Sequence, residues 1–358
     1  MKYEYWFANV KGITNKRKRS ILETVKSTEK LYYIEETELK QMEFSEKECS
    51  AILDSIRGWD LEKEYQLFVE KDIQLVSIFD ERYPKRLVNI PNAPYMLYVK
   101  GELPKEEKPT IAIVGARECS PYGETMARAF AKELALSGVQ IVSGMARGVD
   151  AASQWSALEA GGKSFGVFGC GVDICYPKEQ QSLYHRLKEQ GGVISEYSPG
   201  TPPLPQHFPA RNRIISGLAD IILVMEAKEK SGSLITADMA LEQGKDVYAL
   251  PGPINSRLSQ GCNWLIRQGA GILLSPKDLL EELGICELRK DKSEENKKLL
   301  LETKENIVYS CLDLQPRNVD WIIGQTQMSV SDILDIVMQL ELKGVIKEVS
   351  KNYYVKAK

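Results

Sequence analysis

Glycine is concentrated in one part of the chain, since 20 of the 26 glycines lie between residues 111 and 280. Within this stretch, short runs rich in β-branched side chains alternate with longer segments of helical periodicity. The predicted strands span residues 111–114, 140–143, 165–168, 193–195, 221–224 and 246–250. Strands that alternate with helices at this spacing form a parallel sheet through right-handed crossovers, with helices on both faces. The pattern therefore predicts an α/β core built on a doubly wound parallel sheet.

Two smaller units are predicted to flank this core, which we place at residues 76–285. Residues 1–75 are rich in Glu and Lys and poor in glycine, which indicates a small helical domain of the SAM-like or helix-hairpin-helix-like type. Its turn at residues 12–16 suits either a DNA phosphate bound by exposed N–H groups or an ordinary helix–helix connection. Residues 286–306 are highly charged and predict a linker. Residues 307–358 show two helical segments and a β-hairpin, the pattern of a winged helix, which binds either duplex DNA or protein.

The composition excludes several classes of protein. A chain of 358 residues, 43% apolar and 27% charged, is typical of a globular protein with two or three domains. The N-terminus has no signal-peptide pattern, and no apolar run is long enough to span a membrane. Seven scattered cysteines without a Cys-x-x-Cys pair, and only two histidines, supply neither a disulfide framework nor a zinc site. We therefore expect a cytoplasmic protein without a metal, and its net charge of −3 permits only a local basic site.

Candidate binding residues follow the predicted strands. In an open parallel sheet, ligands bind beyond the carboxyl ends of the strands. Glycine-rich clusters stand at three such positions, residues 115–117, 144–148 and 169–171. Glycine N–H groups and helix N-termini favour phosphate, although any one of these glycines also suits a tight turn. Arg117, Arg147 and Lys178 are predicted to add positive charge to the same edge.

Two further motifs carry polar side chains. The first is Phe208-Pro-Ala-Arg-Asn-Arg213, in which two arginines follow an aromatic ring, a combination suited to phosphate contact and base stacking. The second, Lys230-Ser-Gly-Ser-Leu-Ile-Thr236, opens a helix with three hydroxyl groups and a glycine. This pattern is typical of an anion-binding nest, of a helix cap, or of both at once.

Several enzyme classes lack their motif in this chain. There is no Gly-x4-Gly-Lys-Ser/Thr loop for ATP. Residues 144–148 have the spacing of a nucleophile elbow, but Ala146 occupies the position of the serine. Residues 166–171 depart from the dinucleotide fingerprint, and no acidic ribose partner follows a second strand. We therefore expect no cofactor.

Ordered motifs run along most of the chain: Tyr83-Pro84 and residues 94–101, 115–117, 143–150, 171–177, 195–196, 208–213, 231–236, 251–252 and 261–266. Together they resemble the DprA (Smf) family of bacterial DNA-processing proteins. The resemblance implies a helical N-terminal domain, an extended Rossmann core and a C-terminal winged helix. It also implies a homodimer that binds incoming single-stranded DNA, protects it, and loads the recombinase RecA during natural transformation.

The chain departs from the family pattern at two places. Ser153-Gln154 stands where the family usually has Ala-His, and Gln180 stands where it usually has asparagine. Loss of a histidine would disable an acid–base enzyme, whereas a binding protein tolerates it.

The motifs and the resemblance predict a non-catalytic protein with little sequence preference. Arginine and lysine side chains neutralise phosphates, glycine N–H groups position the backbone, and Phe208 or Tyr176 supports a base. The predicted DNA-binding residues are Arg117, Gly144, Arg147, Gly148, Gly169, Gly171, Lys178, Phe208, Arg211, Asn212, Arg213, Ser231, Gly232, Ser233 and Thr236.

Two alternatives remain open in the sequence. Trp264, Leu265 and Ile266 form an apolar run that belongs either to a symmetric dimer contact or to the core. The hydroxyl-rich helix start also resembles the phosphate loop of lysine-decarboxylase-like nucleotide phosphoribohydrolases, in which Glu196 or Glu242 would assist cleavage of an N-glycosidic bond. The two flanking domains have no role in that second hypothesis.

Overall fold

The computed structural model describes residues 1–42, 44–285, 303–312, 316–326 and 328–356. Its contacts divide the chain into two compact units, Met1–Lys290 and Asp291–Lys358, which we describe separately. Among the described residues, no helix is long and apolar enough to cross a membrane.

The chain opens with a group of helices: α1 (Lys2–Asn9), α2 (Asn15–Val25), α3 (Thr28–Tyr32), α4 (Glu36–Gln41), α5 (Glu46–Gly58) and α6 (Leu61–Val69). Side chains cap several of them. Thr14 accepts a hydrogen bond from the first turn of α2, and Ser45 and Glu48 form a reciprocal capping box on α5. Trp6 of α1 is fully buried among these helices. The helical character predicted for this part of the chain is confirmed.

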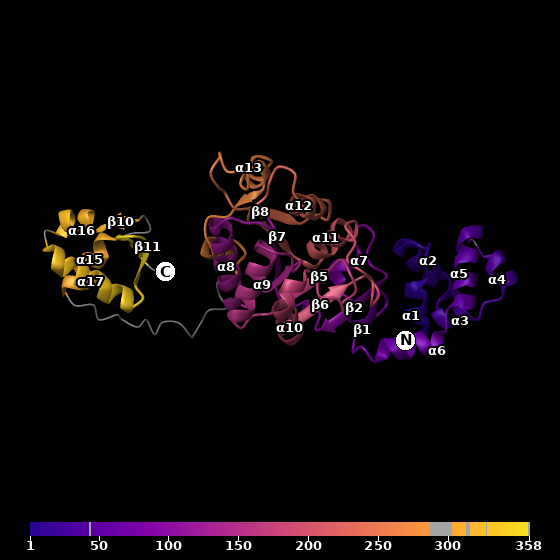
Figure 1. The fold of residues 1–358 in the computed structure, drawn as a ribbon. Coiled ribbons are helices and arrows are strands. Elements are labelled where there is room, and N and C mark those ends of the chain that lie inside the picture. Colours follow the sequence, from indigo (N-terminus) through magenta and orange to yellow (C-terminus); the bar gives the residue numbers. More distant parts are fainter. Residues whose placement is uncertain (43, 286–302, 313–315, 327, 357–358) are drawn as a thin grey trace. The chain divides into compact units, whose positions relative to one another are not determined.

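A single sheet organises the rest of the first unit (Figure 1), with the strand order β1-β2-β6-β5-β4-β3-β7-β8-β9. The strands are β1 (Gln74–Ser77), β2 (Met96–Gly101), β3 (Thr110–Val114), β4 (Gln140–Ser143), β5 (Ser164–Phe168), β6 (Gly191–Ser195), β7 (Ile221–Val224), β8 (Asp246–Ala249) and β9 (Gly271–Ile272). Strands β3 to β9 pair in parallel, whereas β1 and β2 join one edge as antiparallel strands. The predicted parallel sheet is confirmed, and β1, β2 and β9 are additions to it.

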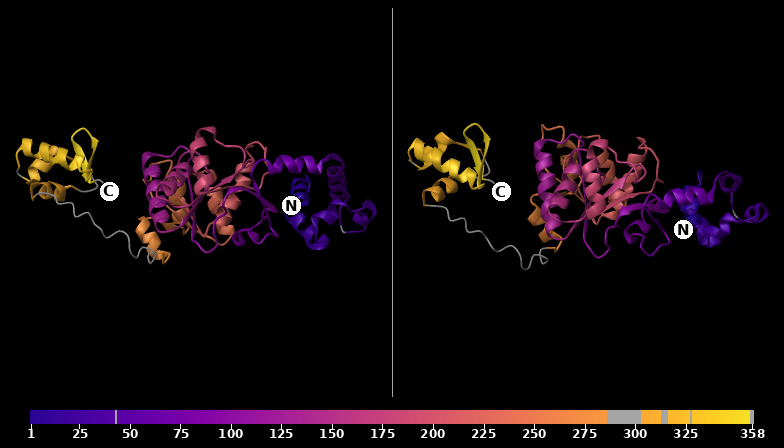
Figure 2. Two further views of the ribbon diagram at one scale, coloured as in Figure 1. Left: turned by 90° about the horizontal axis from the view of Figure 1, so that it is seen from below. Right: turned by 60° about the horizontal axis from the view of Figure 1, so that its bottom comes forward.

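Helices cover both faces of this sheet (Figure 2). They are α7 (Lys85–Val88), α8 (Pro121–Leu136), α9 (Val149–Glu159), η1 (Lys178–Gln180), α10 (Gln181–Gln190), α11 (His207–Leu218), α12 (Gly232–Glu242), α13 (Gln260–Arg267) and α14 (Pro276–Glu282). Side chains alternate between the two faces along β3. Ile111 and Ile113 cluster with α8, α9 and α14, whereas Ala112 and Val114 cluster with α11 and α12.

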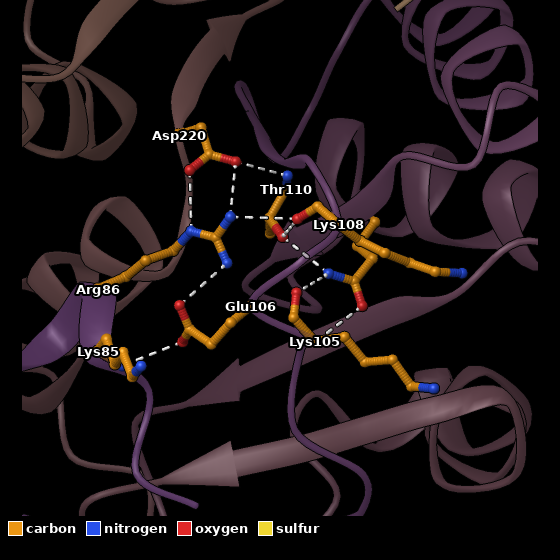
Figure 3. A network of polar contacts seen from close by, with 8 residues as sticks. Lys85, Arg86, Lys105, Glu106, Lys108, Thr110 and Asp220 are labelled. Atoms are coloured by element: carbon orange, nitrogen blue, oxygen red, sulfur yellow. Dashed lines mark hydrogen bonds and ion pairs between the residues drawn. The ribbon is translucent and has the colours of Figure 1, made fainter. Parts of the chain in front are cut away.

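A polar network joins β3 to β7 at their amino ends (Figure 3). The Arg86 guanidinium donates to both carboxylate oxygens of Asp220, at 2.8 and 3.0 Å, and the Thr110 N–H donates to the same carboxylate at 2.8 Å. Asp220 directly precedes β7, and Thr110 begins β3. The network therefore fixes the two central strands at the end opposite their carboxyl ends.

The strand order reverses between β3 and β7. From β3 the chain proceeds through β4, β5 and β6 on one side, and then returns to the other side of β3 at β7. Ligands of open α/β sheets bind in the crevice at the carboxyl ends of the strands where such a reversal occurs. The fold thus places the candidate site at the carboxyl ends of β3 and β7.

The second unit comprises α15 (Thr303–Cys311), β10 (Arg317–Asn318), α16 (Val319–Thr326), α17 (Val330–Leu342), β11 (Ile346–Ser350) and β12 (Tyr353–Lys356). The strands form a small antiparallel sheet in the order β10-β12-β11, and the core includes Ile322, Ile333, Val337 and Leu340. This is the predicted winged helix, extended by α15. Residues 286–302 of the predicted linker lie outside the described residues, and its last residues belong to α15.

Candidate nucleic-acid interface

A cavity of about 440 Å³, which we call the strand-end cavity, opens at the reversal between β3 and β7. Its lining includes Gly115 and Arg117 after β3, Ala146 and Asp150 after β4, Tyr176, Phe208, Arg211 and Asn212, and Ser231, Gly232, Ser233 and Thr236 at the start of α12. A smaller cavity of about 110 Å³ shares several of these residues and adds Gly144 and Arg147. The structure brings ten of the fifteen predicted residues to these two cavities. Gly148, Gly169, Gly171, Lys178 and Arg213 lie outside both linings.

Three stacked side chains form one wall of the strand-end cavity. The Arg117 guanidinium lies over the Phe208 ring, 5.6 Å from its centroid. The Tyr176 ring lies against Phe208 with a centroid separation of 5.3 Å and an interplanar angle of 31°. Arg117 and Tyr176 are exposed, whereas Phe208, which contacts both, is half-buried. A stack with an exposed aromatic face and an exposed cation offers a nucleic acid both a surface for a base and a partner for a phosphate.

Arg211 places a buried positive charge at the same site. Its side chain is 5% exposed, and Nη1 donates to the carbonyl oxygen of Gly144 at 3.1 Å and to that of Val167. Burial lowers the pKa of Arg211 to about 10, so the guanidinium stays protonated at neutral pH. Its Nε has no hydrogen-bond partner among the residues that the structure describes. The strand-end cavity therefore carries a fixed cation that the protein neutralises only in part.

The backbone N–H groups after β4 are not free to bind phosphate. The Asp150 carboxylate accepts the N–H of Gly144 at 3.1 Å and that of Ala146 at 3.4 Å. The amide oxygen of Gln154 accepts the N–H of Met145 at 3.0 Å. The prediction that N–H groups of residues 144–148 position a phosphate is thus wrong for residues 144–146, because two side chains of α9 already accept their N–H groups.

The predicted site glycines outside the cavity linings have structural roles. Gly148 is the N-cap of α9 with φ 71°, and a Cβ at this position would clash with the carbonyl oxygen of Ala116. A Cβ on Gly169 would come within 3.1 Å of the Phe208 ring, so this glycine allows α11 to approach. The Gly171 N–H donates to the Thr201 carbonyl at 3.0 Å and is not available to a ligand.

Arg213 does not reach the cavity, and its prediction as a phosphate contact is corrected. The side chain is buried, and its two terminal nitrogens donate to the Glu196 carboxylate at 2.7 and 2.6 Å. Its Nε donates to the carbonyl oxygen of Asn92 at 3.0 Å. Glu196 also accepts a hydrogen bond from Asn15 of α2, at 3.3 Å. Arg213 thus anchors α11, whereas Arg211 of the same helix faces the cavity.

Two predicted cations, Arg147 and Lys178, are exposed. Arg147 lines the smaller cavity and forms an ion pair with Glu179, with both side chains largely exposed. Exposed ion pairs of this kind contribute little to stability, so the pair leaves Arg147 able to exchange its partner for a phosphate. Lys178 is exposed on η1, outside both linings.

The hydroxyl groups at the start of α12 cap the helix, as one of the two sequence interpretations expects. The Ser231 and Ser233 hydroxyls lie 2.7 Å apart, and Ser231 accepts the Ser233 N–H at 3.4 Å. Asn212 of α11 donates to the Gly232 carbonyl at 3.2 Å. All four residues also line the strand-end cavity, where the N-terminus of α12 adds partial positive charge.

The structure assigns roles to residues outside the fifteen predicted ones. Tyr176, which the sequence names with Phe208 as an alternative support for a base, belongs to the stack, and Asp150 lines the cavity while it organises the loop after β4. Gln154, a departure from the family pattern, is fully buried and also donates to the Phe165 carbonyl at 3.0 Å. A fully buried glutamine with both ends of its amide bonded supports the loop and does not face a ligand.

The carboxylates named for an N-glycosidic cleavage do not line the strand-end cavity. Glu196 is engaged by Arg213, and Glu242 is exposed at the last residue of α12, whereas the cavity lies at the first. The geometry therefore does not favour the phosphoribohydrolase alternative.

In the apolar run of residues 264–266, predicted as a dimer contact, one side chain is exposed and two pack in the core. Leu265 is buried in the core cluster of β7 and α12, and Ile266 packs against that cluster. The assignment of these two residues to a contact surface is thus corrected. Trp264 is 52% exposed, with the Arg267 guanidinium 5.4 Å from its ring centroid.

The fold is thus that of an α/β protein with a Rossmann-like sheet, and a cavity lined by cationic and aromatic side chains lies where the strand order reverses. A sequence profile described as DNA recombination-mediator protein A matches residues 74–284, and one described as DprA winged helix domain matches residues 293–350. The chain belongs to this DprA (Smf) family.

Individual relatives agree with this assignment. The chain is 44% identical over 226 residues to the DNA processing protein DprA of Streptococcus pneumoniae, a match that covers 62% of this chain and 77% of the relative. It is 45% identical over 210 residues to the protein Smf of Escherichia coli, covering 58% and 56% of the two chains.

Two solved structures show the same fold. The crystal structure of DprA from Streptococcus pneumoniae matches with a TM-score of 0.70 and 37% identity, covering 79% of this chain and 98% of that one. A structure of DprA from Helicobacter pylori, described for its single-stranded DNA binding mode, matches with a TM-score of 0.53 and 29% identity, covering 59% and 95%.

Proposed function

We propose that this protein binds single-stranded DNA in the strand-end cavity, without catalysis, protects the strand, and delivers it to the recombinase RecA during natural transformation. Two findings support single-stranded DNA as the ligand: the chain belongs to the DprA (Smf) family, and the Helicobacter pylori structure is described for its single-stranded DNA binding mode. The RecA step and the transformation setting are carried over from the resemblance to the family.

The observation that carries the proposal is that the stack of Arg117, Phe208 and Tyr176 lines the same cavity as the buried Arg211. Stacked bases and neutralised phosphates are the two contacts by which proteins bind single strands irrespective of sequence. A base paired in a duplex does not expose its face to such a stack. The site therefore favours single strands over duplex DNA and reads little sequence.

The lining offers no acid–base pair for a reaction. Asp150 is the acidic side chain among the lining residues, and its carboxylate is occupied by two backbone N–H groups. Burial raises the pKa of this carboxyl, and the nearby Arg211 opposes that rise. Asp150 organises the loop, which fits a binding role.

The test is a titration of a fluorescent single strand and of its duplex with the full chain. Replacing Phe208 by alanine removes the centre of the stack, so the affinity for the single strand should fall by about 1 to 3 kcal/mol with little change in its salt dependence. Phe79 is an exposed phenylalanine outside the cavity lining and supplies the matched control, Phe79→Ala. The proposal fails if Phe208→Ala binds like the parent, or if the parent prefers the duplex.

A further inference from the structure

Helix α17 of the winged helix has two apolar faces. The first contains Ile333, Ile336, Val337 and Leu340 and is buried in the core of the module. The second is an outer stripe of Val330, Leu334, Met338 and Leu342, which are 56, 46, 64 and 79% exposed. Single exposed apolar residues are common, but four at successive i, i+4 positions form one continuous patch on a helix. A patch of this kind marks a binding surface.

The charges on α17 are acidic. Asp332, Asp335 and Glu341 belong to this helix, and no lysine or arginine occurs between residues 330 and 342. In helix-turn-helix modules the corresponding helix enters the major groove and meets base edges and phosphates. Here that helix presents leucine and methionine side chains beside carboxylates. The phosphates of DNA would repel these carboxylates.

The remaining lysines do not make the module basic. Lys343 forms an ion pair with Glu305, with Nζ–Oε distances of 2.6 and 2.7 Å, and Lys356 lies 4.4 Å from the centroid of the Tyr309 ring. Residues 303–356 contain six lysines and arginines against seven aspartates and glutamates. Lys343 and Lys356 are thus engaged in contacts within the module.

We propose that the outer stripe of α17 is a docking surface for a protein partner, namely an amphipathic helix with large apolar side chains on one face and lysine or arginine beside them. The stripe supplies the apolar contact, as in other complexes that seat a helix on a hydrophobic surface. The carboxylates at 332, 335 and 341 supply the charge complementarity that selects a basic partner over an acidic one.

The length of the stripe sets the size of the partner. From residue 330 to residue 342 the axis of α17 rises by about 18 Å, at 1.5 Å per residue. A helix of about three turns would cover it. Because the winged helix carries this surface and the first unit carries the strand-end cavity, the proposal is independent of the DNA site.

The experiment uses the full chain and two synthetic helical peptides of about three turns. Both peptides have leucines on one face. The other face carries lysines in the Leu–Lys peptide and glutamates in the otherwise identical Leu–Glu peptide. Fluorescence anisotropy should show about tenfold tighter binding of the Leu–Lys peptide, because only that peptide complements the carboxylates. Neutralisation by Asp335→Asn with Glu341→Gln should narrow this difference.

The stripe itself is tested by Leu334→Gln with Met338→Gln, which removes apolar surface without changing charge. This variant should lose about tenfold in affinity for the Leu–Lys peptide. Leu136→Gln, at an exposed leucine of α8 in the first unit, should not. Since both stripe side chains point to solvent, equal melting temperatures of parent and variant verify that the module remains folded.

Four results of the binding experiments would overturn the proposal: neither peptide binds, the two peptides bind equally well, the stripe variant binds the Leu–Lys peptide like the parent, or duplex DNA displaces that peptide. A fifth result comes from sedimentation, which tests whether a second copy of the chain occupies the stripe. If the parent assembles and the stripe variant does not, the stripe serves self-association and the proposal is overturned.

Discussion

Arg211 and Arg213 lie two positions apart on α11, and successive residues of a helix are rotated by about 100°, so the two side chains leave the helix in different directions. One faces the strand-end cavity, and the other is buried against Glu196. The sequence predicts the same role for both because their residue type and spacing suit phosphate. Only the position of the Glu196 carboxylate, which comes 17 residues before Arg213 in the sequence and beside it in the fold, separates their roles.

Asp150 illustrates the same limit. The glycines at 144 and 148 predict a loop that exposes N–H groups, and the loop is present. Its N–H groups are nevertheless bonded to the carboxylate of Asp150 and to the amide of Gln154. A sequence pattern shows where a backbone can bind an anion, but not whether a side chain of the same protein already occupies that place.

Lys18 gives a prediction for the pH dependence of stability. The side chain is buried, Nζ donates to the Ala8 carbonyl at 2.6 Å, and burial lowers the pKa of Lys18 to about 8 from an ordinary value of 10.5. Between these two values the unfolded chain holds the proton and the folded chain does not. The free energy of unfolding should therefore rise with pH in this window, by about 3 kcal/mol for this group alone.

The measurement is urea unfolding of the parent and of Lys18→Met from pH 8 to pH 10.5. The difference between the two curves isolates Lys18, because the buried tyrosines titrate alike in both proteins. The variant should lack the rise. Parallel curves for parent and variant would show that burial does not perturb Lys18.

At the scale of elements, the strands after residue 110 are predictable because each is a short β-branched run between helices. Strands β3 to β8 appear where the pattern places them, with ends shifted by no more than two residues. Strands β1 and β2 precede the glycine-rich stretch and pair antiparallel, with the four-residue α7 between them in the sequence in place of a long crossover helix. They therefore lack the alternation on which the prediction depends, and β9 is only two residues long.

The start of α9 supplies a prediction at this scale. Gly148→Ala would combine a left-handed backbone conformation with a clash against the Ala116 carbonyl, so it should lower the free energy of unfolding by more than about 1 kcal/mol. Gly244 has nearly the same φ, 69°, with open space around its Cα, and Gly244→Ala is the matched control. A loss at residue 148 no larger than that at residue 244 would contradict the assigned contact.

At the scale of the whole molecule, each unit carries an exposed apolar region: the outer stripe of α17 in the second unit, and a group of side chains on α12 and α13 in the first. Ile235 and Leu241 of α12 and Trp264 of α13 line a hollow of about 850 Å³, and all three side chains are exposed. We propose that the chain forms a homodimer, as the resemblance implies, and that this region is its contact. Of the three residues that the sequence indicates, Trp264 stays in the contact, and Ile235 and Leu241 take the place of Leu265 and Ile266, which pack in the core.

Sedimentation tests this assignment. Trp264→Glu should shift the assembly toward a single chain, since a carboxylate in the centre of an apolar contact loses its water without gaining a partner. Leu136→Glu, on an exposed leucine of α8 that does not line this hollow, should leave the assembly unchanged. A folded Trp264→Glu protein that sediments like the parent would reject the contact.

The central claim is that the strand-end cavity binds the phosphates of a single strand, and salt dependence measures it most directly. Each phosphate neutralised on a single strand contributes about −0.7 to the slope of log affinity against log salt concentration. Arg117→Ala should weaken binding and flatten the slope by about that amount, equally for poly-dT and mixed sequences. Arg128→Ala, at an exposed arginine of α8 paired with Glu124, should keep the slope of the parent. If Arg117→Ala keeps both the affinity and the slope of the parent, the strand is bound elsewhere and the account is wrong.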